Sequence, residues 1–99
     1  LVAVRPVPGQ CVKELYCYQT PSSTEWSPQL AHTAFLPNVM VDITGFEEAK
    51  AQALLAYQTE IRAYPHPRSP QYVRETDRAR GLQWGLNYSE AFMLFRKTV

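Results

Sequence analysis

The sequence predicts an α/β fold that this chain does not complete by itself. Two runs rich in β-branched and aromatic residues are followed by two stretches of helical composition. The predicted helices carry apolar stripes, and two or three strands are too few to cover them. At 99 residues, with 45% hydrophobic and 12% aromatic side chains, the chain has the composition of one globular domain rather than of a disordered tail.

The first predicted strand spans residues 11–20 and ends before Pro21, which cannot continue the strand pairing. The next seventeen residues, 21–37, hold three prolines and many hydroxyl groups, so we expect a loop. A loop of that length is usually functional or docked on a partner surface. Cys11 and Cys17 lie on one face of the predicted strand, about 20 Å apart. That separation excludes a disulfide and favours two reduced thiols in a cytoplasmic protein.

A second strand is predicted over residues 38–43, where β-branched side chains alternate with others. Thr44 and Glu47 then match a capping box, which predicts that Thr44 is the N-cap of a helix. We expect this helix over residues 47–64, because the stretch has no glycine or proline and many strong helix formers. Its apolar stripe consists of Phe46, Ala49, Ala53, Leu54, Tyr57 and Ile61.

Residues 65–70 hold three prolines and interrupt the helical pattern. Ser69 at the N-cap and Pro70 in the first turn predict a second helix, which runs to residue 84. On its surface we expect two ion pairs between residues three apart, Glu75–Arg78 and Asp77–Arg80.

The last part of the chain contains two glycines and an aromatic segment. Gly81 and Gly85 indicate either a close approach of another backbone or the end of the helix. Residues 88–95 are expected to form a strand or a short turn at the edge of the fold.

Charge and hydropathy exclude several classes of function. The net charge is +1 with acids and bases interspersed, which argues against a nucleic-acid-binding surface and against a polybasic membrane anchor. No apolar run approaches the roughly 18 residues that a membrane span needs. The first residues lack a signal-peptide pattern and an initiator Met, so we expect the chain to begin within a longer protein.

The sequence contains no recognisable catalytic or metal-binding motif. His32 and His66 are the only histidines, and neither belongs to a spaced ligand pattern. The four glycines are scattered singly, so there is no phosphate-binding loop, and there is no nucleophile elbow. We therefore expect no catalytic residue and no metal ligand in this chain.

Two clusters of polar residues remain as candidate substrate-binding sites. In residues 21–26, Ser23, Glu25 and Trp26 combine a hydroxyl, a carboxylate and an indole that suit a sugar or another polar substrate. The alternative is a capped turn in which Trp26 closes the edge of the core.

The second cluster lies in residues 65–69, where prolines stiffen the loop that presents His66 and Arg68 beside a helix N-terminus. Arg68 suits the recognition of a planar carboxylate or phosphate. Alternatively, Arg68 ties down the loop by bonding carbonyl groups at a helix C-terminus.

Four sequence runs together resemble the C-terminal third of LmbE-like (PIG-L type) de-N-acetylases. They are VDIT at 41–44, the stretch from Lys50 to AYQTE at 56–60, PHPRS at 65–69, and the spaced glycines with YSEAF at 81–92. Ser89 stands where Ala is commoner in that family. The match covers roughly residues 11–95, and the order and spacing of the runs carry it.

The resemblance implies that residues 1–99 are the C-terminal segment of a Rossmann-like, three-layer deacetylase domain whose catalytic N-terminal part is absent. Such enzymes usually use zinc to remove acetyl groups from N-acetylglucosamine-type conjugates. Their metal-binding signature, P/A-H-P-D-D-E, does not occur here. The resemblance therefore implies zinc in the full-length enzyme, none in this fragment, and no activity of the fragment alone.

The expected partners are the remaining N-terminal part of the same domain or another copy of the chain, with a sugar conjugate as substrate of the full-length protein. A different hypothesis is a small self-associating interaction module without catalysis. The coding sequence upstream distinguishes the two, because only the deacetylase hypothesis requires the metal-binding signature there.

Overall fold

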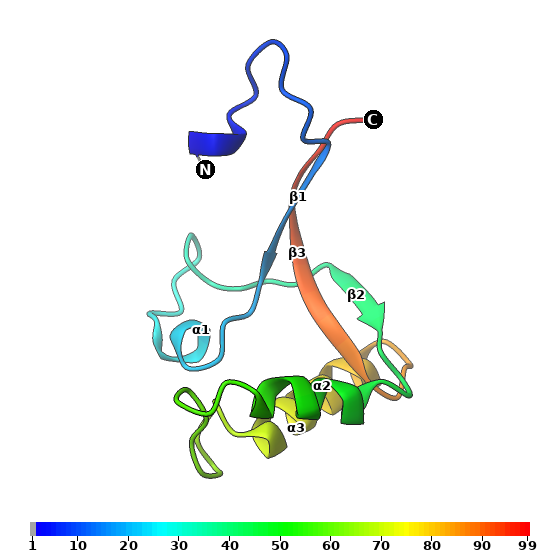
Figure 1. Ribbon diagram of the computed structural model, residues 1–99. Helices are drawn as coiled ribbons and strands as arrows, with labels where there is room; N and C mark the ends of the chain where they lie inside the picture. The colour runs from blue at the N-terminus through cyan, green and yellow to red at the C-terminus, as the bar shows by residue number, and fades with distance from the viewer. Residues whose placement is uncertain (1) are drawn as a thin grey trace.

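The computed structural model describes residues 2–99 as a mixed α/β fold with a three-stranded antiparallel sheet (Figure 1). The strands follow the order β1-β3-β2. The elements are the 3₁₀ turn η1 (Val2–Val4), β1 (Glu14–Tyr18), α1 (Ser23–Trp26), β2 (Val39–Asp42), α2 (Glu47–Leu55), α3 (Pro70–Gln83) and β3 (Ser89–Lys97). The predicted α/β class is confirmed, and the predicted loop contains the additional short helix α1.

The last strand, β3, lies in the centre of the sheet, so its predicted place at the edge was wrong. It pairs with β1 from Glu14↔Lys97 to Tyr18↔Phe92 and with β2 from Val39↔Phe92 to Asp42↔Ser89. The physical reason is length: β3 continues for nine residues, so its first half pairs with β2 and its second half pairs with β1. Both cysteines are free thiols. The prediction that they share one strand face was wrong, because β1 begins at Glu14 and Cys11 lies before it at an exposed position.

No helix within residues 2–99 has the length and apolar character to cross a bilayer. The two longer helices, α2 and α3, lie together at the end of the sheet where β3 begins, and β1 and β3 extend away from them as a ribbon (Figure 1).

The predicted capping box at the start of α2 is wrong. The Thr44 hydroxyl accepts a hydrogen bond from the backbone N–H of Tyr88 at 3.3 Å. The N-cap of α2 is Phe46, whose side chain makes no cap. Asp42 accepts the Thr44 N–H at 3.0 Å, and Gly45 turns the chain with φ +91°, so Thr44 is used to join β2 to the start of β3.

Helix α2 ends at Leu55, well before the predicted end at residue 64. Phe46, at the start of the predicted apolar stripe, and Tyr57, beyond the observed end of the helix, are 66% and 68% exposed. Because helices of this length are stabilised mainly by packing of the apolar face, a stripe without a covering surface does not sustain the last two turns. Residues 57–60 form a turn instead.

Helix α3 begins as predicted. Ser69 is the N-cap, its hydroxyl accepts the Tyr72 N–H at 3.1 Å, and Pro70 occupies the first turn. The two predicted ion pairs within α3 are wrong, because their members bond outside the helix. Asp77 pairs with Lys50, and Arg78 donates to Asn87.

The hydrophobic core is very small within the described residues. Val73 is the one buried hydrophobic side chain, at 9% exposure. Apart from Pro67, the other buried side chains of the described part are polar: Ser22, Ser69, Asp77 and Ser89. The positions of the loops and helices therefore depend largely on hydrogen bonds and ion pairs.

Gly81 provides a test of the predicted close approach. A Cβ at this position would lie 2.9 Å from the backbone of Asn87 and Tyr88. In a free helix, Gly→Ala would stabilise by about 1 kcal/mol. We expect Gly81→Ala to lower the free energy of unfolding by about 1–3 kcal/mol, as overpacking does. Urea unfolding measures this effect. Gln83→Ala, at an exposed position of α3, is the control, and its free energy of unfolding should lie within about 0.5 kcal/mol of that of wild type. Stabilisation by Gly81→Ala would contradict the close approach.

Candidate functional site

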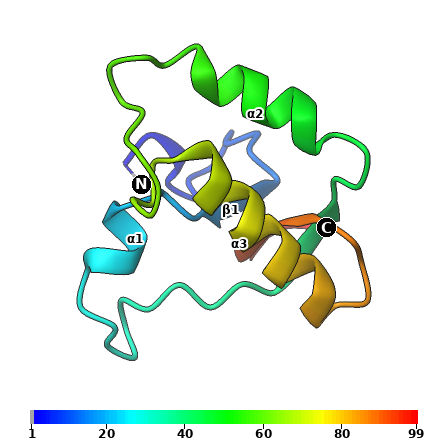
Figure 2. The same ribbon diagram turned by 90° about the horizontal axis from the view of Figure 1, so that it is seen from below.

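The two predicted polar clusters, forty residues apart in the sequence, lie side by side in the structure. The rings of Trp26 and His66 meet edge to face, with centroids 5.2 Å apart and planes at 83°. Figure 2 shows α1 beside the loop that leads into α3. A second contact joins the same segments, because Arg68 donates to the hydroxyl of Ser22.

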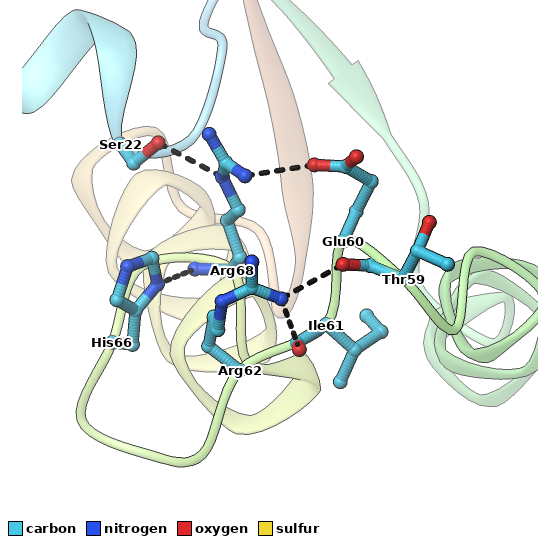
Figure 3. Close-up of polar contacts among 7 residues, drawn as sticks. All are labelled: Ser22, Thr59, Glu60, Ile61, Arg62, His66 and Arg68. Atoms are coloured by element: carbon cyan, nitrogen blue, oxygen red, sulfur yellow. Dashed lines mark hydrogen bonds and ion pairs between the residues drawn. The ribbon is translucent and has the colours of Figure 1, made fainter.

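Arg68 joins three segments of the chain (Figure 3). Its Nε donates to the Ser22 Oγ at 3.0 Å, and its Nη1 forms an ion pair with the Glu60 Oε2 at 2.7 Å. These contacts link the turn before α1, the turn after α2 and the proline-rich loop. Arg62, rather than Arg68, donates to backbone carbonyls, those of Thr59 and Ile61. The alternative in which Arg68 bonds carbonyl groups at a helix C-terminus is therefore wrong, and Arg68 instead holds the loop through the side chains of Ser22 and Glu60.

Ser22 has an unusual backbone conformation for which the contact with Arg68 compensates. Its φ of 72° lies in the left-handed region, which is sterically unfavourable for a serine because, unlike glycine, it has a Cβ atom. The side chain is only 3% exposed. The bond from Arg68 therefore satisfies a buried hydroxyl and holds the turn from which α1 starts.

His66 is held in one hydrogen-bonding state. Its Nδ1 accepts the backbone N–H of Arg68 at 3.0 Å (Figure 3). An accepting Nδ1 carries no proton, so in the neutral ring the proton is on Nε2. The imidazole therefore offers an N–H donor on the side away from the Arg68 backbone.

Trp26 is 65% exposed, so the alternative in which it closes the edge of the core is wrong. Ser23 and Glu25 lie on the same short helix. The Glu25 Oε1 accepts from the side-chain amide of Gln19 at 2.7 Å. The other carboxylate oxygen, Oε2, is buried without a hydrogen-bond partner.

Two cavities adjoin at Pro21 and Val73, which line both. The outer cavity, of about 270 Å³, is bounded by the turns around residues 20–23 and 57–61 and by Arg68. The central cavity, of about 170 Å³, lies among β1, α1, α2, α3 and β3. Of the predicted site residues, Ser23 and Arg68 line the outer cavity and Glu25 lines the central one. Trp26 and His66 line neither of these two cavities.

An ion-pair network that sequence reasoning missed lines the central cavity. The Lys50 ammonium lies 2.7 Å from the Asp77 Oδ2 and 2.7 Å from the Glu90 Oε1. Asp77 is 8% exposed. Burial raises the pKa of Asp77 above its ordinary value, while the hydrogen bond and charge of Lys50 act in the opposite direction. Nothing local in the sequence signals this network, because its members belong to α2, α3 and β3.

Comparisons with protein-family models, with curated proteins and with solved structures find no match to this chain. Within residues 2–99, no group of three or more His, Cys, Asp or Glu side chains is arranged to hold a metal ion. The described residues therefore do not fit a zinc site, and we assign no zinc ligand to them.

The raised pKa of Asp77 predicts a pH dependence of stability. The native state takes up this proton more readily than the unfolded state, so Asp77 adds stability as the pH falls from its raised native pKa towards its ordinary value. We expect wild type to gain free energy of unfolding relative to Asp77→Asn over that window, measured by urea unfolding from pH 7 to pH 4.

Asp42 supplies a control of opposite sign. Hydrogen bonds from Thr44 lower the pKa of the exposed Asp42 carboxyl, so its contribution is present above the ordinary pKa and is lost as the pH falls through the lowered one. Wild type should therefore lose stability relative to Asp42→Asn as the pH falls below the ordinary Asp pKa of 3.8, so the urea unfolding of this pair is followed to below pH 4. Parallel pH profiles for wild type and Asp77→Asn would show that the burial of Asp77 has no energetic effect.

Proposed function

We propose that this chain forms the C-terminal part of a zinc-dependent de-N-acetylase of the LmbE-like type. In this proposal the complete enzyme is a Rossmann-like cytoplasmic α/β hydrolase that removes acetyl from N-acetylglucosamine-type conjugates. The observation that carries the proposal is the meeting of Trp26 with His66 and of Ser22 with Arg68. One of the four runs that carry the resemblance, PHPRS at 65–69, thereby forms one surface with residues 21–26, the other predicted polar cluster.

The small core supports a place within a larger domain. With Val73 as the one buried hydrophobic side chain of the described part, the apolar stripe of α2 and the faces of the sheet have little to cover them. Large exposed apolar surfaces are rare in monomeric domains. The remaining N-terminal part of the same domain is the first partner that we propose, and it would also supply the metal ligands.

In this proposal His66, Trp26 and Arg68 have different roles. The His66 Nε2–H is placed to donate to the substrate or to the oxyanion that develops when water attacks the amide carbonyl. The exposed indole of Trp26, which meets the His66 ring edge to face, offers apolar surface for a sugar ring. Arg68 acts mainly as a positioning residue, because two of its nitrogens are already bonded to Ser22 and Glu60.

This division predicts different effects of His66→Ala and Arg68→Ala in the full-length enzyme. We expect His66→Ala to lower kcat/KM by about 100-fold or more, as for loss of one oxyanion donor, with little change in melting temperature. Arg68→Ala should lower both quantities. Arg62→Ala is the matched control, because Arg62 bonds only backbone carbonyls of the same turn, and it should lower the melting temperature alone. Wild-type kinetics for His66→Ala with a lowered melting temperature would overturn the proposal.

A second candidate function, a small self-associating module without catalysis, is favoured by the open edges of the sheet. Strands β1 and β2 are the outer strands, and each presents unpaired backbone groups that can pair with another strand. In this hypothesis the partner is another copy of the chain.

Self-association is tested with residues 1–99 alone. We expect light scattering to show dimers or larger species at about 100 μM, because edge pairing and apolar burial act together. Tyr16→Lys combined with Val41→Lys puts a charge on both outer strands and should shift the chain towards the monomer. Val2→Lys, at an exposed position outside the sheet, is the control and should have no effect. A wild-type monomer at high concentration would contradict self-association.

A further inference from the structure

The central cavity has features of a ligand site that the proposed function does not use. It is a partly open cavity that is lined by side chains from five elements, among them Tyr18 of β1, Glu25 of α1, Lys50 of α2, Tyr72, Thr76 and Asp77 of α3, and Phe92 of β3. Its volume of about 170 Å³ can be compared with an engineered apolar cavity of about 150 Å³ that holds benzene. A ligand of about six heavy atoms therefore fits.

Glu25 gives this cavity an unsatisfied charge. Its Oε2 is the one buried side-chain nitrogen or oxygen within residues 2–99 that lacks a hydrogen-bond partner. The Gln19 amide bonds the other oxygen, Oε1, and no cationic group forms an ion pair with Glu25 in the described structure. Glu25 as a residue is partly buried, but a buried carboxylate oxygen without a hydrogen-bond partner is unfavourable, so its position at a cavity wall points to a ligand that donates a hydrogen bond and carries a positive charge.

The other charges of the wall do not remove this surplus. Three carboxylates, those of Glu25, Asp77 and Glu90, face two cations, Lys50 and Arg80, which leaves one net negative charge. Lys50 is shared between Asp77 and Glu90, at 2.7 Å from each. The Arg80 guanidinium lies 6.0 Å from the centre of the Phe35 ring and forms no ion pair within the described residues. A single positive charge therefore balances the cavity.

Three aromatic side chains contribute to the rest of the wall. Tyr18, Tyr72 and Phe92 line the cavity together with the alkyl side chain of Val73. Aromatic faces attract an ammonium group through their quadrupole, and they also cover an apolar stem. A neutral ligand would leave Glu25 unbalanced, and an anion would add to the surplus negative charge.

We propose that the central cavity binds a small organic cation, a primary ammonium group on an apolar stem of about five carbons. The ammonium group balances the Glu25 carboxylate, and the stem lies against the aromatic side chains. This inference rests on the cavity alone, so it stands or fails independently of the proposed deacetylase function.

Pentylammonium is the probe, and ¹H–¹⁵N NMR spectra of the 99-residue chain are the measurement. We expect saturable shifts of the amides of Thr76, Ala91 and Phe92, with a Kd on the order of 1 mM for a ligand of this size. The neutral 1-pentanol should bind at least about fivefold more weakly, and pentanoate should cause no saturable shift, because both lack the positive charge. Equal binding of pentylammonium and 1-pentanol, or no saturable shift with pentylammonium, would overturn the proposal.

Substitutions assign the binding to Glu25. Glu25→Gln removes the unpaired charge, so we expect about tenfold weaker binding of pentylammonium together with a raised melting temperature. Glu48→Gln, at an exposed carboxylate of α2, is the matched control and should bind as wild type does. Thr76→Leu fills the cavity without a change of charge and should abolish binding. Undiminished binding by folded Glu25→Gln or by Thr76→Leu would place the ligand elsewhere and contradict the proposal.

Discussion

The shared ammonium group of Lys50 is the interaction on which the arrangement of α2, α3 and β3 depends. Within residues 2–99, Val73 is the one buried hydrophobic side chain, and such a small core cannot by itself fix three elements relative to one another. Lys50 reaches from α2 to Asp77 on α3 and to Glu90 on β3. The pair with Asp77 is partly buried, and in such surroundings electrostatic interactions are stronger than in water and the loss of one partner is costly. The network therefore fixes the relative positions of α2, α3 and β3, which in other proteins is the role of a larger hydrophobic core. It also forms one wall of the central cavity.

Directional polar contacts position the rest of the structure in the same way. Asn38 accepts the Leu94 N–H at 2.8 Å and so fixes the start of β2 on β3. Ser89 is fully buried, and its hydroxyl donates to the sulfur of Met40. Such contacts depend on angle as well as distance, so they fix the loop geometry without the area that hydrophobic packing needs. A candidate site built from loops, such as the surface of Trp26 and His66, can be held by this means.

Sequence reasoning succeeded where structure is determined by neighbouring residues and failed where distant segments compete. The start of α3 follows from Ser69 and Pro70, and the close approach at Gly81 follows from glycine itself. The capping box failed because Tyr88, from the other end of the domain, takes the Thr44 hydroxyl. Helix α2 was predicted too long because propensity does not reveal that its apolar stripe lacks a covering surface. Both polar clusters of the candidate site were visible in the sequence, but their contact and the Lys50 network depend on the tertiary fold.

One turn of the chain links the candidate site to the central cavity. Ser22 is hydrogen-bonded by Arg68 and directly precedes α1. Helix α1 carries two residues of interest: Trp26 contacts His66 at the surface, and Glu25 lines the central cavity. Pro21 and Val73 separate this cavity from the outer one. Loss of the hydrogen bond from Arg68 to Ser22 would therefore move Trp26 and Glu25 together, because a single short helix carries both. Ser22 has a left-handed backbone conformation, which is unfavourable for a residue with a side chain. The hydrogen bond from Arg68 therefore stabilises the turn that connects the candidate site to the central cavity.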